Sequence, residues 1–106
     1  MITKEQVLNA SSQPKKITVP VLGDVFIRLI SEEQALSAGK STGPEVRAKM
    51  ACYSLCNEDG ERIFEDGDVD EITKQLKFVS ILEIFTQSIE HNGLMTSEAE
   101  EEPVKN

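Results

Sequence analysis

The most regular hydrophobic pattern in the chain lies in residues 74–92 and predicts a long helix. On a helical wheel its large apolar side chains fall within an arc of about 160°, which is typical of a helix face that packs on a core. Leu76 and Ile84 lie outside this arc, among polar residues, and are therefore predicted to be on the surface. Gly93 follows, at a position where a glycine commonly ends a helix. The predicted core face consists of Phe78, Val79, Ile81, Leu82, Phe85 and Ile89.

Residues 16–30 predict a β-hairpin. They are mostly β-branched and apolar, and Gly23-Asp24 interrupts the run. Pro20 has no backbone N–H to donate, so we expect its strand at a sheet edge or with a bulge at this residue.

Four shorter helices are predicted before the long one. Two of them begin with a capping box, in which a Ser or Thr is followed three residues later by Gln. Another has Pro44 at its first position, where proline is well tolerated. Asp68 is a candidate N-cap for the last of the four. Their ranges are about 4–10, 31–39, 44–56 and 69–73.

These elements predict an α+β fold. The hairpin and the helices over 44–56 and 74–92 hold most of the large apolar residues, and they can form one core only together. We therefore expect a mostly helical single domain over residues 1–95, with an N-terminal β-hairpin packed against helices. Residues 96–106 contain four Glu and no aromatic residue, which predicts a flexible, disordered acidic tail.

The charge is negative and unevenly distributed. The 106 residues include 19 acidic and 11 basic side chains, a net charge of −8. Residues 1–56 carry +2 and residues 57–106 carry −10. Acidic proteins repel phosphate groups, so we expect no binding to nucleic acid or to an anionic membrane. The chain also lacks a signal peptide and an apolar run long enough to span a membrane, which favours the cytosol.

Few side chains could carry catalysis. His91 is the single histidine, and Cys52 and Cys56 are the two cysteines. Their spacing of four differs from the CxxC pattern of redox and zinc sites. We therefore predict two reduced, partly buried thiols on one face of a helix.

Two segments are similar to ligand-binding motifs but fail at required positions. Gly39-Lys-Ser-Thr is similar to the end of a Walker A loop, but Gln34 stands where the first glycine of that motif is required. Residues 57–68 are acidic, yet they place Leu55 or Arg62 at the first ligand position of an EF-hand loop, depending on the glycine aligned. We therefore predict no metal, nucleotide or redox cofactor and no enzymatic activity.

The order of these features resembles the tail assembly chaperones of long-tailed (siphovirus-type) bacteriophages and prophages. That family opens with a short capped helix similar to residues 3–8 and a hairpin similar to residues 16–30. Its signature, DEDGxxxF…DV, is similar to Asn-Glu-Asp-Gly-Glu-Arg-Ile-Phe at 57–64 followed by Asp-Val at 68–69. Residues 89–94 resemble the NGL motif at the end of that family's sequence. The chain departs from the family at Asn57, where Asp is commoner, and in the loop 39–44.

The resemblance implies a protein that binds the tape measure protein, keeps it soluble and helps recruit tail tube subunits during tail morphogenesis. It implies a homo-oligomer in the cytoplasm of the infected or lysogenic bacterial host, absent from the mature virion. It also implies that this chain is the shorter product where a frameshift yields a longer one. We predict Leu76, Ile84 and His91 as partner-binding residues, the alternative being that a neighbouring element covers this helix face.

Two other classes of function stay open. An acidic DNA-mimic or inhibitor-type protein-binding module would use the negative second half, although mimicry needs carboxylates in a regular surface array. Many of the carboxylates here lie instead in predicted turns and in the tail. A small hydrolase or transferase would use Cys52 or His91, for which the sequence shows no orienting partner.

Overall fold

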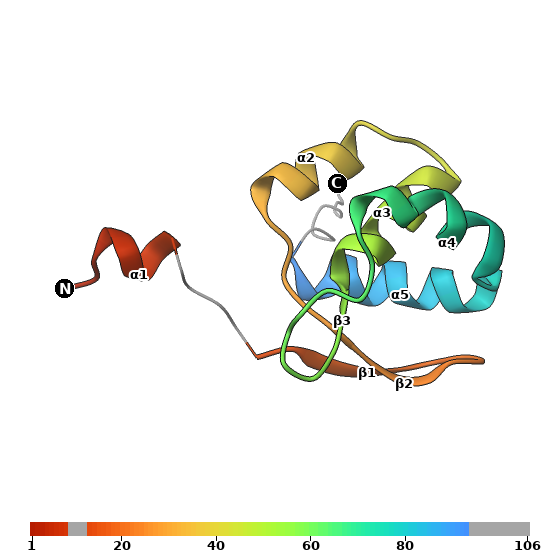
Figure 1. Cartoon of the computed structure of the whole chain (residues 1–106), viewed down its shortest axis with the longest axis horizontal. Coiled ribbons are helices and arrows are strands. Elements are labelled where there is room, and N and C mark those ends of the chain that lie inside the picture. Colours follow the sequence, from red (N-terminus) through yellow and green to blue (C-terminus); the bar gives the residue numbers. More distant parts are fainter. Residues whose placement is uncertain (9–12, 94–106) are drawn as a thin grey trace, which may run out of the picture.

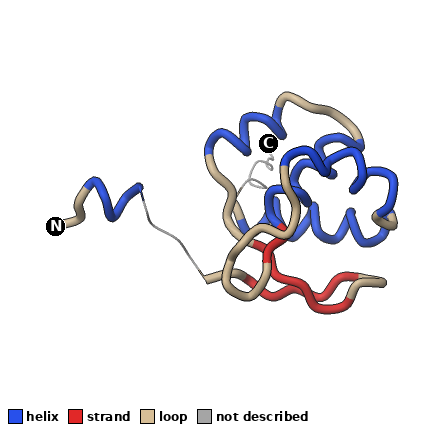
Figure 2. The backbone as a smooth tube through the Cα atoms, viewed as in Figure 1, coloured by secondary structure: helices blue, strands red, loops and turns tan. Residues whose placement is uncertain are grey.

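A small antiparallel sheet packs against a layer of helices in the computed structural model, which describes residues 1–8 and 13–93 (Figures 1 and 2). The strands β1 (Lys15–Val19), β2 (Gly23–Ile27) and β3 (Leu55–Cys56) pair in the order β1-β2-β3. The α+β prediction, with a hairpin packed on a mostly helical domain, is confirmed. The predicted tail, residues 96–106, lies outside the described residues. The helices are α1 (Lys4–Leu8), α2 (Glu32–Gly39), α3 (Pro44–Ser54), α4 (Val69–Gln75) and α5 (Phe78–His91), with a 3₁₀ turn η1 (Asp66–Asp68) before α4.

The hairpin turn lies three residues earlier than the predicted break. Val19 pairs with Gly23, so the connection consists of Pro20, Val21 and Leu22. Proline cannot donate in the ladder, and this ends β1 before the turn. Asp24 lies inside β2, where its carboxylate accepts a hydrogen bond from the Thr18 hydroxyl at 2.9 Å.

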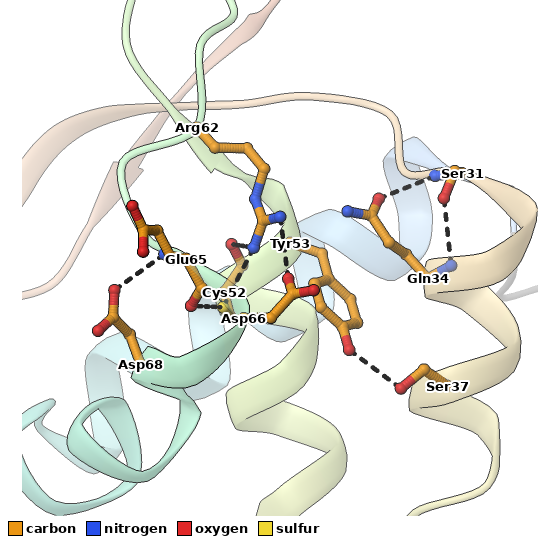
Figure 3. Close-up of polar contacts among 9 residues, drawn as sticks. All are labelled: Ser31, Gln34, Ser37, Cys52, Tyr53, Arg62, Glu65, Asp66 and Asp68. Atoms are coloured by element: carbon orange, nitrogen blue, oxygen red, sulfur yellow. Dashed lines mark hydrogen bonds and ion pairs between the residues drawn. The ribbon is translucent and has the colours of Figure 1, made fainter.

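Both predicted capping boxes are present. At the start of α1, the Thr3 hydroxyl accepts from the backbone N–H of Gln6, whose side chain accepts in return from the Thr3 N–H. Ser31 and Gln34 make the same reciprocal pair at the start of α2 (Figure 3). Residues 9–10, which were also predicted to be helical, lie outside the described part of the chain.

Helix α3 lies at the centre of the helical layer. It packs against α2, α4 and α5, and its second half is buried on nearly all sides. It ends at Ser54 and not at Cys56, because Leu55 turns to extended backbone and pairs with Ile27 of β2. Cys56 is therefore in a strand, and the prediction that both cysteines share one helix face is wrong.

The predicted helix 74–92 is divided by an extended residue. Leu76 has ψ 136°, so α4 ends at Gln75 and α5 begins at Phe78. Asp68 stands at the N-cap of α4, as predicted, but its side chain does not cap that helix. Its carboxylate accepts a hydrogen bond from the backbone N–H of Glu65 at 2.8 Å and so closes η1, while α4 has no side-chain cap.

Helix α5 is rotated relative to the predicted core face. Ile84 is fully buried, whereas Phe78, Val79 and Leu82 are 61%, 52% and 42% exposed. The predicted surface position of Ile84 is therefore wrong, as is the predicted burial of those three residues. The buried face includes two small polar residues, Ser80 and Ser88, that a hydrophobic wheel does not score as core. Of the predicted core face, Ile81 is buried, and Phe85 and Ile89 pack partly against the core.

Candidate partner-binding surface

Exposed apolar residues are found both in the first turns of α5 and in the hairpin turn. Phe78, Val79 and Leu82 project from the outer face of α5. The Ser80 hydroxyl donates a hydrogen bond to the carbonyl of Pro20 at 2.5 Å, which joins the hairpin turn to α5. The next two residues of that turn, Val21 and Leu22, are also exposed. We call the five residues Val21, Leu22, Phe78, Val79 and Leu82 the α5–turn surface.

The backbone of the hairpin turn is strained within this surface. Val21 has φ +75°, and among the described residues other than glycine it is the only one with a positive φ. A β-branched residue rarely adopts this conformation, which costs about 1–3 kcal/mol. Strained backbone of this kind clusters at functional sites, so the hairpin turn is a candidate part of a binding surface.

A small groove borders the α5–turn surface at Phe78. It has a volume of about 110 Å³ and lies between α3, α4 and α5. The Arg47 guanidinium stands 5.4 Å from the centroid of the Phe78 ring, a cation–π contact that holds the ring at the rim. Ligand pockets usually measure about 300 Å³ or more, so this groove suits one apolar side chain better than a cofactor. Its lining residues are Pro44, Arg47, Thr73, Leu76, Phe78 and Ile81.

The three residues predicted to bind a partner do not come together. Leu76 is half-buried and lines the groove. Ile84 has no exposed surface with which to contact a partner. His91 lies at the C-terminal end of α5. At 1.5 Å per helical residue, it is about 20 Å along the helix from Phe78, the first residue of α5. Contact of Leu76 or His91 with a partner stays a prediction. The exposed apolar side chains of α5 are instead ones that the wheel assigned to the core.

His91 lies in a partly buried position near the start of β1. Its Nε2 atom is buried and has no hydrogen-bond partner among the described residues. Burial lowers the pKa of His91, and the nearby charge of Lys15 lowers it further. The adjacent Asn92 accepts a hydrogen bond from the Ile30 N–H at 2.9 Å, which anchors this end of α5 to the segment after β2.

Acidification should therefore destabilise the protein through His91. The unfolded chain, with its ordinary histidine pKa, binds a proton more readily than the folded protein, so stability is lost as pH falls below about 6.5. We expect the thermal midpoint to drop less for His91→Gln than for the wild type between about pH 7.5 and pH 5.5. Thermal unfolding followed by circular dichroism measures both. Parallel losses in the two proteins would show that His91 does not contribute.

A polar cluster around Arg62 attaches the segment after β3 to α3 (Figure 3). The Arg62 guanidinium donates to the carbonyl of Cys52 at 3.3 Å, lies 5.6 Å from the centroid of the Tyr53 ring, and pairs with the carboxylate of Asp66 at 3.0 Å. The Cys52 thiol donates to the carbonyl of Glu65 at 3.1 Å. The sequence patterns did not predict this cluster, whose one signal is a lone Arg within an acidic segment.

The two cysteines lie in the interior of the domain. Cys52 and Cys56 are both free and buried, as the sequence predicted for reduced thiols. Burial raises the pKa of both thiols, against the opposing charges of Arg62 at Cys52 and Arg28 at Cys56. A thiol with a raised pKa is a poor nucleophile at neutral pH.

The acidic segment 57–68 begins with a hydrogen-bonded turn. The Asn57 side chain accepts from the backbone N–H groups of Asp59 and Glu61, which is the geometry of an Asx turn. Within the residues that the structure describes, no group of three His, Cys, Asp or Glu side chains is placed to hold a metal ion.

Comparison with known proteins gives a structural match. No family model and no curated protein matches the sequence. Among solved structures, the bacteriophage HK97 tail assembly chaperone superposes with a TM-score of 0.63 at 17% sequence identity. The match covers 81% of this chain and 94% of that chain. The two chains share a fold.

This match agrees with the resemblance read from the sequence motifs. A match at 17% identity shows that the architecture is shared. The structure adds that no helix in the described ranges 1–8 and 13–93 is long and apolar enough to cross a membrane.

Proposed function

We propose that this protein is a phage tail assembly chaperone that binds the tape measure protein, keeps it soluble and helps recruit tail tube subunits. The observation that carries the proposal is the fold shared with the HK97 tail assembly chaperone over nearly all of that chain. The order of motifs along the sequence supports it independently. The protein would act as a homo-oligomer in the cytoplasm of the bacterial host, without enzymatic activity, and would be absent from the mature virion.

The surface chemistry supports a protein partner. Exposed apolar side chains gathered on one helix and an adjoining turn commonly mark a protein interaction site. Amphipathic helices bind such surfaces through apolar anchors spaced three or four residues apart. The α5–turn surface and its neighbouring groove provide apolar contacts of this kind.

Co-expression tests the proposal. The full chain would be produced together with the tape measure protein encoded in the same phage or prophage genome, and the tape measure protein in the soluble fraction would be quantified. We expect its soluble yield to rise several-fold and the two proteins to co-purify. An unrelated acidic protein of similar size is the matched control. A tape measure protein that stays insoluble and does not co-purify would contradict the proposal.

A further inference from the structure

We propose that a groove along α3 and α4 binds a cationic amphipathic helix of the partner protein, in which a Lys or Arg side chain lies one turn away from a large apolar one. The inference rests on the proposed function, because it names the kind of tape measure segment that this protein would recognise. Experiment can separate the two, since the proposed function needs only that the tape measure protein binds somewhere.

Two adjoining hollows form this groove. The first is the small groove of about 110 Å³ beside Phe78. The second has a volume of about 580 Å³ and lies between the start of α3 and the segment η1–α4, which runs alongside α3 (Figure 1). Pro44 and Thr73 line both hollows, so the two adjoin, and we call them together the α3–α4 groove. The other residues that line the second hollow are Thr42, Glu45, Gly67, Val69 and Asp70.

The two hollows differ in chemistry. The first is lined by Leu76, Phe78 and the buried Ile81, and it suits one large apolar side chain. The second carries the carboxylates of Glu45 on α3 and Asp70 on α4. Each of these carboxylates pairs with one lysine of its own helix, at 3.9 and 3.3 Å, and the two side chains are 59% and 81% exposed. Both therefore remain accessible to a cation from another molecule.

The charge around the second hollow is negative. Residues 65–71 contain five acidic and no basic side chains, and Glu45 brings the number of carboxylates to six. Three of the six form ion pairs, which leaves a net charge of −3; their cations are Lys49, Arg62 and Lys74. A cationic side chain is attracted to this hollow and a like-charged occupant is repelled. The net charge of −8 thus disfavours a second copy, and the four Glu in residues 96–106 disfavour the chain's own C-terminal segment.

A helix is the backbone conformation that suits this groove. None of the residues that line it belongs to a strand, so an extended segment has no strand edge to pair with there. A helix satisfies its own backbone hydrogen bonds and places side chains three or four residues apart on one face, about 5–6 Å from each other. Arg47 lines the first hollow and repels a cation there. The cationic side chain therefore belongs in the second hollow and the apolar one in the first.

Peptide binding tests the inference. Overlapping peptides of about 20 residues, long enough for about five helical turns, would cover the tape measure protein encoded in the same genome. Fluorescence anisotropy would measure the binding of each labelled peptide to the full-length protein. We expect the peptides that bind to contain the predicted pair of side chains. The tightest of them should lose affinity as the salt concentration rises from about 0.05 M to about 0.5 M, because salt screens exposed charges.

A charge exchange locates the contact. Glu45→Lys should weaken binding of the tightest peptide about five- to tenfold, because a repulsion between exposed charges replaces an attraction. Replacing the cationic residue of the peptide with Glu should weaken its binding to the wild type and restore its binding to Glu45→Lys. Glu33→Lys is the matched control, because Glu33 is the second residue of α2, as Glu45 is of α3, and lies outside the groove. It should bind the peptide like the wild type.

Thr73→Trp tests the apolar contact. Thr73 is exposed and lines both hollows, so a large ring at this position should fill the groove and weaken peptide binding about tenfold or more. Thermal midpoints would show that each variant is folded. If Thr73→Trp melts early, the comparison of Glu45→Lys with Glu33→Lys decides the outcome.

The possible failures are distinguishable. Peptide binding that is unchanged in Glu45→Lys and Thr73→Trp would overturn the inference and leave the proposed function standing. The same holds if no peptide binds although the whole tape measure protein co-purifies, whereas both fail if neither binds. Sedimentation velocity of the protein alone gives the last check. A mass that changes in Glu45→Lys but not in Glu33→Lys would show that a second copy occupies the groove, which would also overturn the inference.

Discussion

Replacing Ile84 with aspartate should unfold the protein or lower its free energy of unfolding by about 3 kcal/mol or more. Ile84 is fully buried in the core cluster between α5 and the rest of the domain. An aspartate there would lose the apolar contacts of isoleucine and would place a carboxylate where no partner is available. Urea unfolding followed by circular dichroism measures the loss, as a lower midpoint or as an absent transition.

Val79→Asp is the matched control for this experiment. Val79 is on the same helix but is 52% exposed, so the same new charge should change the free energy of unfolding by no more than about 0.5 kcal/mol. The pair of variants therefore measures the orientation of α5. If Ile84→Asp were tolerated and Val79→Asp unfolded the protein, the helix would face the core as the wheel predicted, and the α5–turn surface would not exist.

Local hydrogen bonding made parts of the fold predictable from the sequence. The capping boxes of α1 and α2 depend on residues three apart, and both form as predicted. Pro44 likewise starts α3, because a proline at the first helical position needs no tertiary support. The hairpin and its packing on the helices followed from the amount of apolar surface that had to be covered.

Tertiary contacts decided the features that the sequence did not predict. Helix α3 ends early because Leu55 pairs with Ile27, a partner far away in sequence. Helix α5 buries Ser80 against the hairpin turn through a hydrogen bond to Pro20, which the wheel could not register. Small side chains at close contacts between elements are scored as polar by hydropathy, and the predicted core face was rotated as a result.

The candidate site was affected by the same error. Leu76 was expected outside the core, but it packs partly against the core and lines the groove beside Phe78. Ile84 was expected beside it and is buried instead, while the exposed Phe78 and Leu82 had been assigned to the core. The prediction that α5 has apolar residues outside the core is thus correct. The exposed residues, however, are not the ones that were predicted. Which helix face is covered depends on the position of the hairpin, which no pattern within α5 encodes.

Replacing Arg62 with alanine should lower the free energy of unfolding by about 2 kcal/mol. Arg62 is mostly buried and joins the segment before η1 to the last turn of α3. The variant loses a charged hydrogen bond to the Cys52 carbonyl, the cation–π contact with Tyr53 and the ion pair with Asp66. Chemical denaturation measures the loss, and alkylation of Cys52 should become faster because the segment covering its thiol is held less firmly.

Two further variants separate the contributions of Arg62. Asp66→Asn removes only the ion pair, and since the Asp66 side chain is 77% exposed, the loss should stay below about 1 kcal/mol. Arg62→Lys keeps the charge but lacks the planar fork that reaches both the Cys52 carbonyl and Asp66, so its stability should fall between those of Asp66→Asn and Arg62→Ala. If Asp66→Asn were as damaging as Arg62→Ala, the surface ion pair would account for the whole effect. The contacts with α3 would then contribute nothing to holding this segment in place.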